Sequence, residues 1–104
     1  IRSIIFLQAK ELTDMESIFC INIPVQMISC TDTDGKITPM RFRFRDKEGE
    51  LTTIQISRIL ESEQKANRIH ASFTCEAEVF GMKKLFDLHY NYSSHAWSLT
   101  RVGL

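Results

Sequence analysis

The sequence predicts an all-β domain, a six-stranded antiparallel meander that curls into a small barrel or folds into a two-layer sheet. Runs of alternating apolar and polar residues recur along the chain, as half-buried strands require. Three of the four glycines, Gly35, Gly49 and Gly81, separate these runs. Glycine tolerates the positive φ of tight hairpin turns, so each glycine marks a turn. With turns set there, the apolar residues of consecutive runs share one face.

Length and composition fit one small globular domain. The chain has 104 residues, of which 43% are hydrophobic and 25% charged, and this balance argues against disorder. The formal net charge is zero, whereas a strongly basic nucleic-acid binder would carry a clear excess of Lys and Arg.

The chain divides into an N-terminal extension of uncertain order, residues 1–21, and a single small β domain, residues 22–104. Ile1, Ile4, Ile5 and Leu12 lie near helical spacing, which is consistent with a short N-terminal helix. The same residues could instead be a fragment edge or an upstream extension, and both alternatives stay open.

Six strands are expected near residues 22–31, 36–46, 50–60, 69–79, 84–92 and 96–102. In the first hairpin, a two-residue type I′ turn at Asp34 and Gly35 would pair Met27 with Phe42. Pro39 lies within the returning strand and lacks an N–H, which indicates an edge position or a β-bulge there.

The second hairpin turns at residues 47–49, with Gly49 at the left-handed bulge position. This turn pairs Phe44 with Thr52 and Phe42 with Ile54, so the apolar side of the second strand again meets apolar partners.

The two C-terminal hairpins follow the same rule. A type II′ turn at residues 81–82 would pair Cys75 with Leu88. A turn within the sequence SSHA would pair Tyr90 with Leu99.

These registers predict a core of alternating apolar residues. A barrel interior so crowded leaves little room for a buried ligand. The expected inward residues are Val25, Met27, Met40, Phe42, Phe44, Ile54, Ile56, Ile69, Ala71, Phe73, Cys75, Ala77, Phe86, Leu88, Tyr90, Trp97 and Leu99.

Catalytic, cofactor-binding and metal-ligating patterns are not found in the sequence, which predicts no enzyme. The sequence DTDG at residues 32–35 reads as a hairpin turn and lacks the later ligands of a calcium loop. No C-x-x-C is present, and a surface position is expected for His89, beside Thr74. Glu76 and Asp87 are expected nearly opposite each other on an open face, where paired carboxylates lack the desolvated cleft that acid–base work needs.

The cysteines and the apolar runs bear on location. An odd number of cysteines, three, with wide spacing predicts reduced thiols and a cytoplasmic protein. No apolar run reaches the length of a membrane span.

The arginines are the candidate binding residues. Arg41, Arg43 and Arg45 alternate with phenylalanines along one strand, so they form an outward cationic row. The alternation sends the phenylalanines into the core, where they cannot stack on bases. The row is therefore either a solvated strand face, with Glu48 and Glu50 available to neutralise it, or an anion-binding surface, and Arg58 and Arg68 could extend the latter.

Three stretches carry a resemblance to known proteins: IPVQMISCTDTDGKITPMRFRFRD, TIQISRILE and FTCEAEVFGMKKLFDLHY. They resemble small bacterial all-β proteins with no assigned activity, over about residues 22–102. The shared features are a turn glycine, a proline before the aromatic–basic strand and a closing tryptophan hairpin. The resemblance implies a compact β domain and a bacterial cytoplasm.

The leading functional hypothesis is a non-enzymatic interaction module, a small β-barrel that binds a protein partner or a second copy of itself through an edge strand. The alternative is weak nucleic-acid or anion binding through the arginine-bearing strand face. Neither hypothesis involves a cofactor or a membrane.

Overall fold

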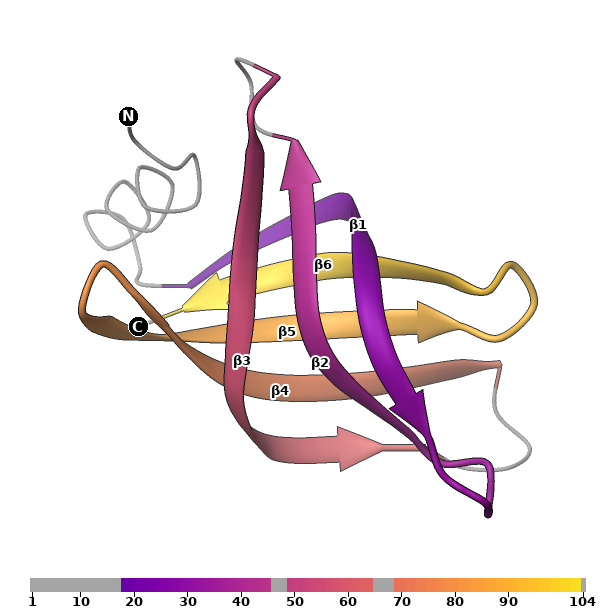
Figure 1. Cartoon of the computed structure of the whole chain (residues 1–104). Coiled ribbons are helices and arrows are strands. Elements are labelled where there is room, and N and C mark those ends of the chain that lie inside the picture. The colour runs from indigo at the N-terminus through magenta and orange to yellow at the C-terminus, as the bar shows by residue number, and fades with distance from the viewer. Residues whose placement is uncertain (1–17, 46–48, 65–68, 104) are drawn as a thin grey trace.

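A computed structural model describes residues 18–45, 49–64 and 69–103 (Figure 1). The expected N-terminal helix and most of the predicted N-terminal extension, residues 1–17, lie outside the described part. The strands are β1 (Ile18–Thr31), β2 (Ile37–Arg45), β3 (Leu51–Glu63), β4 (His70–Val79), β5 (Met82–Asn91) and β6 (Ala96–Gly103). No helix long and apolar enough to cross a bilayer occurs in these described ranges.

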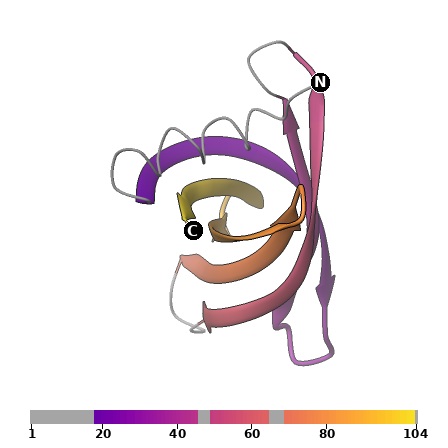
Figure 2. The ribbon, with the colours of Figure 1, turned by 90° about the vertical axis from the view of Figure 1, so that its left-hand side faces the viewer.

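The six antiparallel strands close into a barrel in the order β1-β2-β3-β4-β5-β6. This confirms the predicted all-β meander and shows that it forms a barrel and not a two-layer sheet. Closure depends on two long, bent strands (Figure 2). The first half of β1 pairs with β6 and its second half, from Gln26, pairs with β2. Similarly, β3 pairs with β2 up to Gln55 and with β4 from Ile56 onward. Each long strand therefore passes from one half of the barrel wall to the other.

The first hairpin differs from the predicted two-residue turn. Its loop spans residues 33–35, because the Asp32 N–H donates to the Lys36 carbonyl at 2.9 Å. The Asp32 carboxylate also accepts hydrogen bonds from the N–H groups of Asp34 and Lys36, both at 2.9 Å. Gly35 takes the left-handed position at φ 86°. Because aspartate side chains bond to the backbone two or more residues on, this residue favours the longer loop.

A β-bulge in β2 compensates for the longer turn. Ile28 pairs with Arg41 but Ser29 pairs with Pro39, so Met40 is the extra residue. The bulge restores the predicted pairing of Met27 with Phe42, and it confirms the irregularity expected at Pro39. Met40, predicted to point inward, is instead 45% exposed because the bulge turns it out of the alternation.

The β2–β3 hairpin is paired as predicted. Phe42 faces Ile54, Phe44 faces Thr52, and Arg43 faces Thr53. The outward and inward sides of β2 are therefore those that the alternation indicates.

The β4–β5 turn lies one residue earlier than predicted. Phe80 and Gly81 occupy it at φ 53° and 76°, the two positive values of a type I′ turn. Cys75 consequently pairs with Phe86 and not with Leu88. The predicted register is wrong by two residues, and since side chains alternate with period two, each one stays on its predicted face.

The β5–β6 register is also displaced by two residues. Tyr90 pairs with Trp97, and Leu88 pairs with Leu99, because the turn takes four residues, 92–95. A bulge then leaves Thr100 without a paired residue between Leu99 and Arg101.

The core combines buried inward residues of β2 to β6, and the half-buried Ile23, Val25 and Met27 of β1 pack against it. Ile69 is wrong in the predicted list: it precedes β4 and is 63% exposed. The burial of Val102 was not predicted, because it depends on the β6 bulge. The buried apolar residues are Ile37, Phe42, Phe44, Ile54, Ala71, Phe73, Cys75, Ala77, Val79, Phe86, Leu88, Trp97, Leu99 and Val102.

Candidate functional site

A cationic row lies along the outer side of β2. Arg41, Arg43 and Arg45 are all exposed on one face, because alternate residues of a strand share a face. The Cα atoms of consecutive members are about 6.6 Å apart, two residues along the strand. The same face carries their cross-strand neighbours on β1 and β3. We call it the arginine face, and it consists of Gln26, Ile28, Arg41, Arg43, Arg45, Leu51, Thr53 and Gln55.

The arginine face holds no acidic cross-strand neighbour. Arg41 lies between Ile28 and Gln55, and Arg43 lies between Gln26 and Thr53. Within the described ranges, the two ion pairs lie elsewhere, joining Arg58 to Glu76 at 2.9 Å and Arg101 to Asp87 at 2.8 Å. The cross-strand neighbours on β1 and β3 therefore do not cancel the charge of Arg41 and Arg43. Glu48, expected to neutralise the row, lies outside the described residues, and Glu50 is exposed next to Leu51.

Two of the three guanidinium groups are held in place. Arg43 Nε donates to Gln26 Oε1 at 2.6 Å, and Arg45 Nη1 donates to the Gly49 carbonyl at 2.6 Å. Each bond uses one of five donors and leaves the rest of the planar fork available. Arg41 has no side-chain hydrogen bond to any residue that the structure describes.

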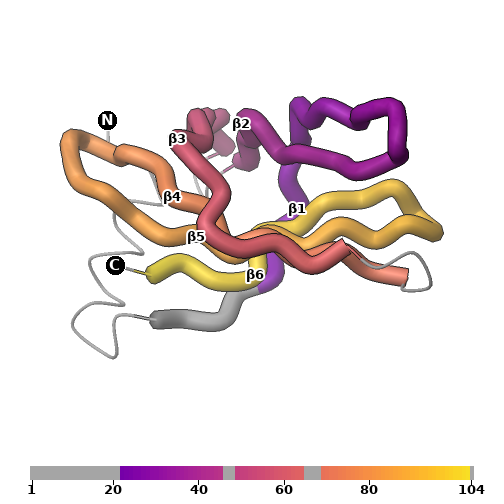
Figure 3. The backbone as a smooth tube through the Cα atoms, turned by 90° about the horizontal axis from the view of Figure 1, so that it is seen from below, coloured from indigo at the N-terminus to yellow at the C-terminus, as the bar shows by residue number. Residues whose placement is uncertain are grey.

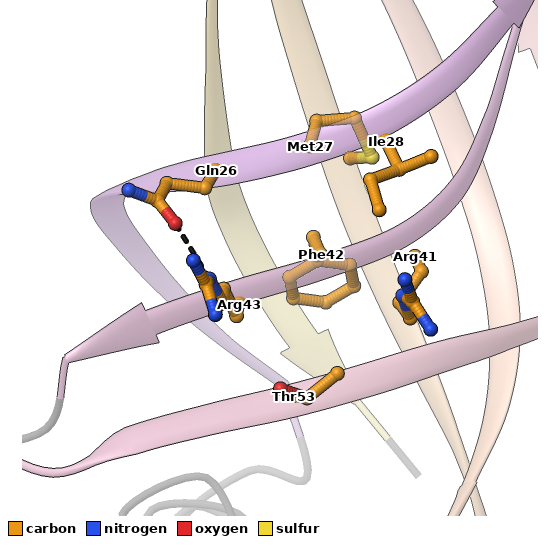
Figure 4. A pocket seen from close by; sticks show the side chains of 7 residues that line it. All are labelled: Gln26, Met27, Ile28, Arg41, Phe42, Arg43 and Thr53. Carbon is orange, nitrogen blue, oxygen red and sulfur yellow. Dashed lines mark hydrogen bonds between the residues drawn. The ribbon is translucent and has the colours of Figure 1, made fainter.

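A shallow groove of about 500 Å³ runs between the arginines (Figure 4). Its lining comes from Gln26, Met27 and Ile28 of β1, Arg41, Phe42 and Arg43 of β2, and Thr53 of β3. Phe42 is only 1% exposed, so it forms part of the floor and presents no ring for stacking. An exposed Ile28 beside the arginines gives the groove a mixed cationic and apolar character.

The structure brings together three of the five arginines that the sequence singles out. Arg58 lies on the half of β3 that pairs with β4, where Glu76 neutralises it. Arg68 lies outside the described residues.

The two carboxylates considered for acid–base work are not opposite each other, contrary to expectation. Glu76 pairs with Leu85, while Asp87 pairs with Thr74 and accepts a hydrogen bond from its hydroxyl at 3.0 Å. Both carboxylates also bond to arginines, so they act as ion-pair partners on the outer wall.

Two histidines meet on the outer face of β4 and β5, a proximity that sequence reasoning missed. The ring centroids of His70 and His89 are 4.7 Å apart. His89 lies opposite Ser72, not beside Thr74 as expected, since the register is displaced by two residues. Burial, and secondarily the neighbouring His70, lowers the pKa of His89.

Hydrogen bonds fix the tautomer of His70. The side-chain oxygen of Asn91, Oδ1, accepts from the N–H groups of Ser93 and Ser94 at 2.8 and 3.0 Å, so its side-chain amide nitrogen points the other way. That nitrogen lies 3.2 Å from His70 Nε2, which must therefore accept. Across the described ranges, no group of three His, Cys, Asp or Glu side chains is arranged to hold a metal ion.

An open cavity lies at one end of the barrel. The cavity has a volume of about 450 Å³ and is lined by residues of β1, β2, β5 and β6. The β1–β2 and β5–β6 hairpins turn at the same end of the barrel (Figure 3). Val25 and Met27 point inward but are only half-buried, since they line this opening. The cavity is open to solvent and most of its lining is exposed or half-buried, so it does not test the prediction that little room remains for a buried ligand.

One inward polar group was also missed. Lys84 is 3% exposed, on the inner side of β5 opposite the buried Ala77, and burial lowers the pKa of its amine.

Comparisons with protein-family models, with curated proteins and with solved structures find no match to the chain.

Proposed function

We propose that the chain is a non-enzymatic interaction module, and that its arginine face binds an acidic segment of a protein partner. The observation that carries this proposal is the row of three exposed arginines whose cross-strand neighbours are uncharged. A solvated strand face would more commonly alternate charges of both signs, because opposite charges across strands stabilise a sheet.

The geometry of the row supports an extended partner. The Cα atoms of the three arginines repeat about every 6.6 Å along β2, which is also the repeat of carboxylate-bearing alternate residues in an extended peptide. Arg43 and Arg45 are already oriented by neutral hydrogen-bond acceptors, so less side-chain entropy is lost on binding.

The apolar members of the face favour a protein over a nucleic acid. Ile28 and Leu51 are exposed at 54% and 47%, beside the arginines. Apolar side chains of a peptide can pack on them, whereas single-stranded nucleic acids bind through aromatic platforms. The phenylalanine rings of β2 point into the core, away from the arginine face.

A selection from a phage-displayed library of random peptides tests the proposal. Wild-type protein should enrich sequences that carry carboxylates at alternate positions together with apolar residues. The Arg41→Gln/Arg43→Gln double variant is the matched selector, since glutamine keeps hydrogen-bonding capacity and removes charge. Wild-type and variant selections that enrich the same sequences would contradict the proposal.

A binding assay with an oligonucleotide tests the alternative, nucleic-acid recognition by the arginine face. A labelled poly-dT strand should bind no more tightly to wild type than to the double variant at physiological salt. Strong wild-type binding that falls steeply with salt and disappears in the variant would instead favour nucleic-acid recognition.

A second copy of the chain is the other partner that the proposal allows, through a stretch of strand edge that barrel closure leaves unpaired. Closure pairs every strand on both sides over part of its length. Beside β2, the Gln64 side chain accepts from the Ile37 N–H at 2.8 Å and donates to its carbonyl at 3.0 Å, so this stretch of edge is occupied. Sedimentation at two concentrations tests self-association: a single monomeric species at tens of micromolar would remove this form of the proposal.

We place the protein in the cytoplasm as part of the proposal. The support is that Cys30, which is exposed, and Cys75, which is buried, are both free thiols.

A further inference from the structure

The cavity at the barrel mouth has an apolar and aromatic wall. Val25 and Met27 of β1 and Ile37 of β2 line one side, and Tyr90 and Trp97, cross-strand partners on β5 and β6, line the other. The Tyr90 and Trp97 ring centroids are 4.9 Å apart. At about 450 Å³, the cavity falls within the range of small-molecule sites.

The mouth also gathers a few polar groups. Tyr90 Oη and His95 Nδ1 lie 3.0 Å apart, so the pair can offer one donor and one acceptor whichever tautomer His95 adopts. The hydroxyls of Ser29 and Thr31 lie at the same cavity on the β1 side. Among the described residues that line it, none is Lys, Arg, Asp or Glu.

The backbone at His95 points to a constrained position. His95 adopts φ 59°, in the left-handed region that non-glycine residues seldom occupy. A hydrogen bond from its N–H to the Asn91 carbonyl at 2.8 Å holds the turn, and the bond to Tyr90 holds the imidazole at the cavity. Such backbone outliers are frequent at ligand-binding sites.

We propose that the barrel mouth binds a small, uncharged, flat heteroaromatic molecule with one hydrogen-bonding group. The aromatic and aliphatic wall provides stacking and apolar contact, and the Tyr90–His95 pair orients the polar group. An uncharged ligand fits because the lining supplies no fixed charge to compensate an ion on desolvation. This site adjoins the arginine face and shares Gln26 with it, but the binding proposed here uses none of the arginines.

Nicotinamide is a suitable probe, because it is flat, heteroaromatic, uncharged at neutral pH and carries one amide. Trp97 is the single tryptophan of the chain and lines the cavity, so its fluorescence reports occupancy. We expect saturable quenching with a Kd of about 1 mM, ordinary for so small a ligand. Amide chemical-shift changes should be confined to the cavity residues on β1, β5 and β6. Cyclohexanecarboxamide, which lacks the flat ring, and nicotinate, which is charged, should bind at least about fivefold more weakly.

Variants with matched chemistry test the location. Ser29→Phe fills the mouth and should weaken nicotinamide binding at least about tenfold. Ser72→Phe places the same side chain on the exposed outer face of β4 and should leave binding unchanged. Tyr90→Phe keeps the wall and removes the polar group, and should weaken nicotinamide more than cyclohexanecarboxamide. Thermal melts confirm that each variant is folded.

Three results would overturn the proposal. One is non-saturable, purely collisional quenching with no localised shift changes. Another is equal binding by the Ser29→Phe and Ser72→Phe variants. The third is tighter binding of nicotinate than of nicotinamide, which would mark an anion site.

Discussion

Replacing Phe42 with alanine should destabilise the fold, although its neighbours on either side are exposed arginines. Phe42 is 1% exposed, pairs with Met27 and Ile54, and contacts Phe86 edge-to-face with centroids 5.8 Å apart. Truncating a buried phenylalanine to alanine costs about 3–5 kcal/mol, since the site collapses only partly. A domain of this size has a total stability of about 5–15 kcal/mol, so the loss is a large share. Thermal melts should show a decrease in Tm of at least about 12 °C.

Arg43→Ala is the matched control one residue away. Its side chain is exposed and its hydrogen bond to Gln26 is at the surface, so the change in unfolding free energy should stay within about 0.5 kcal/mol. If Phe42→Ala fails to fold, Phe42→Leu gives a smaller, measurable loss from the same site. A Phe42→Ala protein that melts like wild type would refute the inward assignment and reopen the stacking interpretation of this strand.

Three further predictions concern single side chains. Gln64→Ala should lower the free energy of unfolding, measured by chemical denaturation, by about 1–3 kcal/mol, because it leaves the Ile37 N–H and carbonyl without the Gln64 side chain. Gln55→Ala, at an exposed position, should lower it by less than about 0.5 kcal/mol. Burial, with a smaller effect of the nearby Asp87, raises the pKa of the Cys75 thiol to about 12. The contribution of Cys75 to stability is therefore complete below the ordinary thiol pKa of 9.0 and declines as the pH rises toward 12. In pH-dependent denaturation, Cys75→Ala should lack that decline. The pKa of His89 is lowered, so stability should fall as pH drops below about 6.5, and His89→Gln should flatten this acid limb in pH-dependent melts.

Alternation explains why the sequence predicted the faces of the strands better than their pairing. Phe73, Cys75 and Ala77 point inward whether Cys75 faces Leu88, as predicted, or Phe86, as found. A displacement of two residues preserves every face, so the apolar pattern alone cannot detect it. The turn residues decide the pairing instead, and a phenylalanine at φ 53° is an uncommon choice for a type I′ turn.

Two errors in the predicted faces arise where β-bulges break the alternation. Met40 was assigned to the core and Val102 was overlooked because a bulge adds one residue and reverses the parity of the residues beyond it. Sequence periodicity predicted the arginine row, which lies on one uninterrupted stretch of β2. It could not predict the mouth cavity or the histidine pair, because both depend on strands brought together by closure and by the actual register.

A charge-reversal cycle tests most directly whether the arginine face is the recognition surface. The affinities of wild type and Arg43→Glu are measured by fluorescence anisotropy for a selected acidic peptide and for the same peptide with one Glu replaced by Lys. Wild type should bind the acidic peptide more tightly than the lysine peptide, and Arg43→Glu should show the opposite preference. Arg43→Glu should bind the lysine peptide at least about tenfold more tightly than it binds the acidic peptide. Equal binding of the acidic peptide by wild type and Arg43→Glu would contradict the proposed role of the arginine face.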